Sequence, residues 1–116
     1  MKKDNFLYIE DINNAIEWIL NDYVVDTTLE EFSYDQKTQD AVIRQISIIG
    51  EAMNKIDTEF LTKHPELPSK KAVSMRNILV HDYDNIDIEK LWKTIKVDLP
   101  ILKEMVSKIL AKEKQS

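Results

Sequence analysis

The sequence contains no cysteine and only one glycine among its 116 residues. The absence of cysteine excludes disulfide bonds, thiolate zinc sites and thiol nucleophiles, and nothing in the sequence indicates an oxidising compartment. A single glycine excludes the glycine-rich loops that bind nucleotide phosphates, such as GxGxxG and the P-loop. Several common classes of nucleotide-dependent enzyme are thereby ruled out.

Long hydrophobic runs are also missing. The longest uninterrupted apolar run covers four residues, 6–9, whereas a membrane span needs ~20 residues and the core of a signal peptide ~7 or more. We therefore expect a cytoplasmic protein that does not contact the membrane.

The charge balance is acidic, with 21 Asp and Glu against 16 Lys and Arg and a formal net charge of −5. Proteins that bind nucleic acid broadly usually carry a basic face, so any contact of this chain with RNA must be local. Among the basic residues only Arg44 and Arg76 are arginines. In a lysine-rich chain, an arginine indicates a position that needs a planar, permanently charged and bidentate donor.

The apolar periodicity predicts a single all-α domain over residues 1–116, an up-and-down bundle of about five helices. Apolar residues recur at three- and four-residue steps, and no alternating run of strand length occurs. Capping residues and prolines mark the helix boundaries. The expected elements are a helix over 4–23, a helical turn from a capping box at Thr28, a helix over 35–56, a helix from a cap at Ser69 towards Val80 or His81, a short helix capped by Asp87, and a last helix starting at 98–100.

The expected helix over 35–56 has an unusually wide apolar face. Its apolar residues span an arc of ~220° at 100° per residue, more than one bundle face requires. The helix is therefore covered on two sides, either by its own bundle and a second chain in a homodimer, or within one chain as a central helix. Gly50, inside this helix, indicates that something approaches its backbone closely, either another helix of the bundle or a partner or ligand.

The candidate functional site is the segment 75–83, which brings Arg76, His81 and Tyr83 to one helix end. Arg76 and Tyr83 align on a continuous helix, whereas His81 lies ~140° from Arg76, so the three converge only if the helix stops near His81. The helix C-terminus and the neighbouring Asp82 and Asp84 are expected to raise the pKa of the His81 imidazole, which suits it to general-acid work near neutrality.

An arginine and a histidine without a metal suit phosphodiester cleavage by a neighbouring 2′-hydroxyl, and therefore RNA as the substrate. Cleavage benefits from both a base and an acid, and a two-fold dimer of this segment would bring two histidines together. Capping and ion pairing with nearby Asp is the alternative. A calcium-type site of His81, Asp82, Asp84 and Asp87 is disfavoured, because the loop lacks its glycine and Lys93 stands where the closing Glu belongs. We expect neither metal nor cofactor.

The spacing of Arg76, His81 and Tyr83 resembles the Rx4HxY signature of HepT-like toxins, within the HEPN superfamily. The resemblance covers nearly the whole chain, because four segments match that family in order and spacing: 38–44, 48–52, 75–81 and 98–100. Family members often have an aromatic residue in place of Ser69 and a glycine in place of Ser74, so the entry to this helix departs from the pattern.

The resemblance implies a metal-independent ribonuclease toxin of the MntA/HepT (type VII) toxin–antitoxin system, with two Rx4HxY segments meeting in a cleft across a homodimer. Arg76 and His81 would be catalytic, and Asn77 would be the supporting polar residue beside the arginine. Tyr83 would accept AMP from a cognate MntA-type nucleotidyltransferase antitoxin. The added phosphate would block the cleft and repel RNA.

The acidic charge of the chain favours a second hypothesis for its function. Lys70, Lys71 and Arg76 are opposed by aspartates at 82, 84 and 87, so RNA capture should be weak and sensitive to salt. The contrasting hypothesis is a non-catalytic helical subunit that binds a nucleotide or a nucleotidyltransferase, with Arg76 gripping phosphate and Tyr83 stacking.

Overall fold

The computed structural model describes residues 3–81 and 85–115, and these ranges contain helices and no β-strand. The expected all-α class is therefore confirmed. The elements are α1 (Lys3–Trp18), η1 (Ile19–Tyr23), α2 (Leu29–Ser33), α3 (Gln36–Lys55), α4 (Thr58–Lys63), α5 (Ser69–His81), α6 (Ile88–Lys93), η3 (Thr94–Asp98) and α7 (Leu99–Gln115). Each helix in the described ranges is too short or too polar to cross a lipid bilayer.

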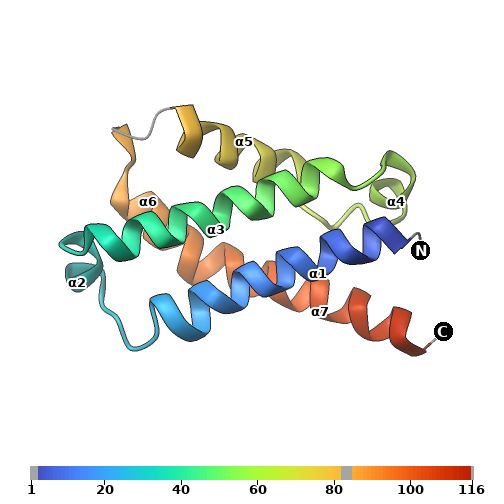
Figure 1. The fold of residues 1–116 in the computed structure, drawn as a ribbon, viewed down its shortest axis with the longest axis horizontal. Coiled ribbons are helices and arrows are strands. Elements are labelled where there is room, and N and C mark those ends of the chain that lie inside the picture. Colours follow the sequence, from blue (N-terminus) through green and yellow to red (C-terminus); the bar gives the residue numbers. More distant parts are fainter. Residues whose placement is uncertain (1–2, 82–84, 116) are drawn as a thin grey trace.

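The long helices α5, α3, α1 and α7 pack in that order, and successive long helices along the chain run in opposite directions (Figure 1). α3 makes its most extensive contacts with α5 on one side and α1 on the other, and α1 in turn packs on α7. The apolar side chains of these helices form one continuous core. This is the expected up-and-down arrangement.

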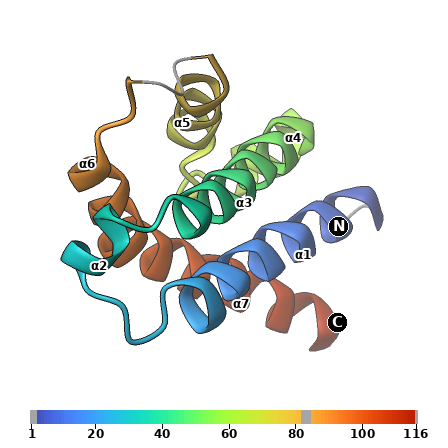
Figure 2. The ribbon, with the colours of Figure 1, turned by 60° about the vertical axis from the view of Figure 1, so that its left-hand side comes forward.

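The wide apolar face of α3 is covered within one chain. The apolar arc includes Ile43 and Ile48, which widen it and are buried and half-buried respectively. Because α1 and α5 lie on opposite sides of α3 (Figure 2), the arc is that of a central helix. The breadth of this face therefore gives no argument for a second chain, and the homodimer stays a prediction.

The capping residues hold the helix starts that the sequence indicates. Thr28 and Glu31 form a reciprocal capping box at α2, with both side chain to backbone hydrogen bonds at 3.1 Å. The Asp35 carboxylate accepts from the backbone N–H of Thr38 at 3.0 Å and from its hydroxyl at 2.6 Å. Both bonds favour the charged form and lower the pKa of the Asp35 carboxyl. Asp87 caps α6 in the same way.

The last helix α7 begins at Leu99 with Pro100 in its first turn, as expected. It is not separated from the preceding helix, because α6, η3 and α7 form an uninterrupted helical segment and Leu99 has helical φ and ψ of −66° and −41°. Pro100 lacks an N–H, and its ring would clash with a carbonyl of the preceding turn of a regular α-helix. The π-helical turn of η3 widens that turn immediately before the proline, and the helix continues.

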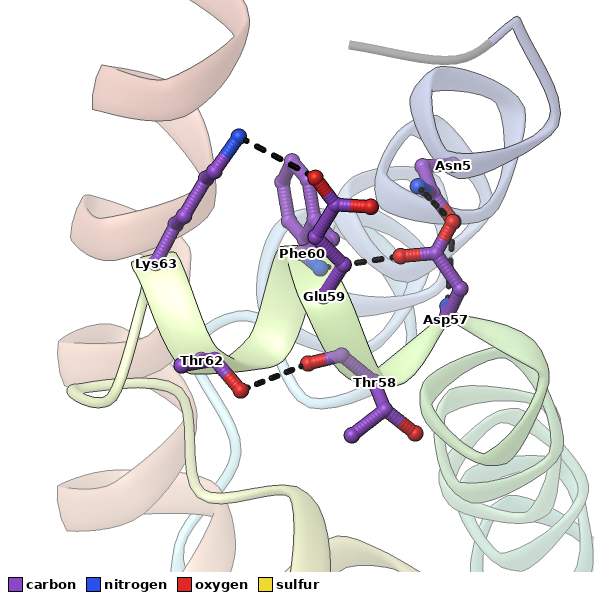
Figure 3. Close-up of polar contacts among 7 residues, drawn as sticks. All are labelled: Asn5, Asp57, Thr58, Glu59, Phe60, Thr62 and Lys63. Atoms are coloured by element: carbon purple, nitrogen blue, oxygen red, sulfur yellow. Dashed lines mark hydrogen bonds and ion pairs between the residues drawn. The ribbon is translucent and has the colours of Figure 1, made fainter.

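The short helix α4 was not expected, and a buried polar contact fixes its start (Figure 3). Asn5 of α1 is 4% exposed. Its amide donates to the Asp57 carboxylate at 3.0 Å and accepts from the Asp57 backbone N–H at 3.2 Å. Asp57 also caps α4 by accepting from the Phe60 N–H at 2.8 Å. The end of α3 and the start of α4 are thereby tied to α1.

Replacing Asn5 with alanine should lower the free energy of unfolding by about 1–3 kcal/mol, because it removes both hydrogen bonds to a partly buried aspartate. Urea unfolding followed by far-UV circular dichroism measures the change. Asn14→Ala is the matched control, since Asn14 is exposed on the same helix, and it should change stability by less than about 0.5 kcal/mol. Equal effects of the two substitutions would contradict the structural role of Asn5.

Candidate functional site

Helix α5 carries Arg76, Asn77 and His81 of the expected site and lies on the side of α3 opposite to α1 (Figure 1). It begins at Ser69, as expected, but Ser69 is its first residue and not its cap. The first helical hydrogen bond runs from the Ala72 N–H to the Pro68 carbonyl at 2.9 Å, so Pro68 occupies the cap position. α5 as described ends at His81.

The structure describes part of the expected site. Arg76 and Asn77 lie in the middle of α5, and the backbone of His81 follows about one and a half turns later. The side chain of His81 and the whole of Tyr83 lie outside the described residues. Asp82 and Asp84 do as well, so the expected convergence of the three motif side chains stays a prediction.

The Arg76 side chain is half-buried between α5 and α3. Its Nε is buried and has no hydrogen-bond partner. Among the residues that the structure describes, Arg76 forms no ion pair and no hydrogen bond. A guanidinium whose charge is not neutralised by a neighbouring carboxylate can bind an anion from outside, and phosphate oxygens match its geometry.

Gly50 of α3 lies directly against Arg76. A Cβ at Gly50 would lie 2.4 Å from the Arg76 Cβ, 2.8 Å from the Ala72 carbonyl oxygen and 3.0 Å from the Arg76 Cγ. The sequence allowed either another helix of the bundle or a partner or ligand beside Gly50. The structure shows another helix of the bundle, α5, in that place. A glycine in a helix interior costs about 1 kcal/mol relative to alanine, and here it permits the close contact between α3 and α5.

Asn77 and the lysines of α5 complete the described surroundings. Asn77 and Lys70 are exposed. Lys71 pairs with Asp98 of η3, with 3.3 Å between Nζ and Oδ2, so part of the basic charge expected near Arg76 is already neutralised. The surroundings of Arg76 are therefore less basic than the sequence alone indicates.

The structure does not test the metal site weighed from the sequence, because the His81 side chain, Asp82 and Asp84 lie outside the described residues. Within 3–81 and 85–115, no group of three or more His, Asp or Glu side chains could hold a metal ion. Of the four residues weighed for such a site, Asp87 is described, and its carboxylate accepts from the backbone N–H groups of Glu89 and Lys90 at 3.0 and 3.2 Å. Its position follows from capping α6.

A large hollow of about 610 Å³ lies elsewhere, between α4 and α7. Lysine and glutamate side chains both line it, together with His64, and Arg76 is not part of its wall. Its mixed charge favours no particular ligand, so Arg76 on α5 is the better candidate for a site that binds phosphate.

Comparison with known proteins gives a family match and several similar relatives. A family model described as "Ribonuclease HepT-like" matches residues 12–109. The chain is 42% identical over 109 residues to "Probable ribonuclease HepT" of Thermococcus cleftensis, covering 94% of this chain and 98% of that protein. It is 41% identical over 103 residues to a "Putative RNase" of Methanocaldococcus jannaschii, covering 87% of this chain and 90% of the relative.

A "Putative RNase" of Caldanaerobacter subterraneus subsp. tengcongensis is 35% identical over 107 residues, which cover 92% of this chain and 95% of the relative. No solved structure gives a significant match. Because the family model covers most of the chain and these relatives match it nearly end to end, the chain belongs to the HepT-like ribonuclease family.

Proposed function

We propose that this protein is a metal-independent endoribonuclease and the toxin of a toxin–antitoxin pair, with Arg76 and His81 as its catalytic residues. The observation that carries the proposal is the similarity over 94% of the chain to a protein named as a ribonuclease. The Arg76 guanidinium, which has no ion pair among the described residues, supports it chemically. Asn77, exposed beside it, is the proposed supporting residue.

In the proposed reaction an unprotonated imidazole takes the proton of an RNA 2′-hydroxyl while that oxygen attacks the adjacent phosphorus. The bond from phosphorus to the 5′ oxygen breaks, and a protonated imidazole gives its proton to the leaving oxygen. The products are a 2′,3′-cyclic phosphate and a 5′-hydroxyl end. Arg76 stabilises the negative charge that grows on the other phosphate oxygens in the transition state.

Two imidazoles require two chains. Of the two histidines of this chain, His64 ends α4, with its Nδ1 3.3 Å from a Glu66 carboxylate oxygen, before α5 begins. Each copy of α5 therefore contributes one histidine, His81. A two-fold homodimer with both α5 C-terminal ends at one cleft supplies the base and the acid together.

Neutralisation of the toxin is proposed to act on Tyr83. A cognate MntA-type nucleotidyltransferase antitoxin would transfer AMP to the Tyr83 hydroxyl, forming an oxygen–phosphorus bond and releasing pyrophosphate from ATP. The added phosphate places a negative charge in the cleft, which repels RNA and competes for Arg76.

Substitution of Arg76 or His81 by alanine should lower cleavage of a single-stranded RNA by at least about 100-fold, because each removes a group that acts in the transition state. The initial rate of cleavage of a labelled oligonucleotide is the measurement. Arg44→Ala is the matched control and should keep the wild-type rate, since Arg44 is exposed on α3.

The same assay separates the alternatives. A chelator should leave the rate unchanged, and a strict requirement for divalent metal would contradict the metal-independent mechanism. Nucleotide binding by the purified protein, with no RNA turnover under any condition, would instead favour the non-catalytic binding subunit. Unchanged cleavage in folded His81→Ala protein would overturn the catalytic assignment.

The homodimer predicts a mass in solution of twice the 13.6 kDa of one chain. Light scattering coupled to size-exclusion chromatography, run across a dilution series with activity measured in parallel, tests it. Activity per chain should fall as the dimer dissociates. A monomer that keeps its full activity would contradict a site shared between two chains.

Incubation with the antitoxin and ATP should add AMP to the wild-type protein and to Tyr34→Phe, but not to Tyr83→Phe. Tyr34 is the control because it is 86% exposed and so tests whether exposure alone selects the acceptor. Intact-protein mass spectrometry reads the adduct. AMP found on Tyr83→Phe would move the acceptor to another residue.

A further inference from the structure

The inference concerns Gly50 and rests on the proposed role of Arg76. The backbone conformation of α3 does not require glycine at this position, because no glycine in the chain has a positive φ. The reason for a glycine must therefore be steric. What it makes room for is α5, and specifically the turn of α5 that carries Arg76.

The atoms that occupy the space beside Gly50 cannot move away independently of the helix. The Arg76 Cβ and the Ala72 carbonyl oxygen, at 2.4 and 2.8 Å from the position of a Cβ, are both fixed by the backbone of α5. No rotation of a side chain relieves these contacts. A methyl group at Gly50 would require α5 to shift by roughly 1 Å or more, because carbon–carbon contacts are favourable only near 3.5–4.0 Å.

The stem of Arg76 is held by this packing, and none of the residues in 3–81 and 85–115 makes a polar contact with it. The Cγ also lies against Gly50, and the buried Nε has no hydrogen-bond partner. In many proteins a carboxylate orients a functional arginine, but no described residue forms an ion pair with this one. The direction of the guanidinium therefore depends on the surface against which its stem rests.

We propose that Gly50 is a positioning residue for Arg76. The missing side chain at position 50 forms a notch in α3 that seats the Cβ and Cγ of Arg76. The notch directs the guanidinium without neutralising it, and the charged end stays available for the RNA phosphate. Because misplacing a catalytic group by 1 Å can cost about 100-fold in rate, a methyl group in the notch should affect catalysis more than folding.

Gly50→Ala should lower kcat for RNA cleavage by about 10- to 100-fold, with a smaller change in KM. Ile9→Val is the matched control, because it trims a fully buried residue of α1 and weakens the core away from α5. It should keep the wild-type kcat. Equal kcat values for the two variants, at a temperature where both are folded by circular dichroism, would overturn the proposal.

A double-mutant cycle separates positioning from a general structural effect. If Gly50 acts through Arg76, adding Gly50→Ala to Arg76→Ala should change the residual rate by less than about two-fold, because the group that it positions is already gone. A further loss as large as that seen in the wild-type background would show that Gly50 acts elsewhere, and would overturn the proposal.

A measurement on the wild-type chain decides the matter if Gly50→Ala fails to fold. The chain has two arginines, so the ¹⁵N signals of their Nε–H groups are assigned with Arg44→Lys. The Arg76 Nε–H should be as ordered as the helical backbone and should exchange with water at least ten-fold more slowly than that of exposed Arg44. Equal mobility and exchange would overturn the proposal.

This readout is independent of RNA cleavage. If the wild-type protein cleaves no RNA but Arg76 is ordered and Gly50→Ala makes it mobile, the proposed ribonuclease function fails while the positioning role of Gly50 stands. If cleavage occurs and depends on Arg76 while Arg76 is as mobile as Arg44, the ribonuclease function stands and the positioning role of Gly50 is overturned.

Discussion

The close contact between α5 and α3 at Gly50 is the constraint on which the candidate site depends. α5 makes its extensive contacts with α3, whereas α3, α1 and α7 are packed together in the body of the bundle. The ion pair between Lys71 and Asp98 joins α5 to η3, but the lysine is 64% exposed, and exposed pairs contribute at most about 1 kcal/mol. Where Arg76 sits relative to the rest of the chain is therefore determined mainly by how closely α5 can approach α3.

In this arrangement the charge of Arg76 is not neutralised by any of the described residues, although the chain as a whole is acidic. Lys71 is paired and Asn77 is neutral, so Arg76 is not surrounded by a basic face of the kind that binds nucleic acid at long range. Under the proposed function, such a site would rely on contact with a single phosphate. Association with RNA would then be slow and locally determined, and catalytic efficiency would depend on geometry at the phosphate more than on electrostatic capture.

The buried contact between Asn5 and Asp57 fixes the part of the chain that precedes α5. It holds the start of α4 against α1, and α4 is followed by the turn through His64 and Pro68 from which α5 begins. A polar contact thus fixes the start of α4, and a steric fit places the middle of α5 against α3. Asn5, Asp57 and Gly50 all lie outside the motif of Arg76, His81 and Tyr83.

The sequence by itself determined what depends on local interactions. Caps at Thr28 and Asp87 and the apolar periodicity identified most helices, because capping and amphipathicity act within one or two turns. The spacing of Arg76, His81 and Tyr83 was likewise recognisable from the sequence, and so was the resemblance to the HepT-like family. The sequence missed α4, which is too short to show a period, and it separated α6 from α7 because Pro100 ends a helix unless a π-turn precedes it.

Tertiary structure alone decided the two questions that the sequence left open. The same apolar arc on α3 fits a dimer interface or a central helix, and only the positions of α1 and α5 show that one chain covers both sides. Likewise, a glycine at position 50 indicates that another group packs closely against it, but it does not show which residue that is. That neighbour, Arg76, lies 26 residues further along the chain, and contacts over such distances depend on how whole helices pack, which no local pattern encodes.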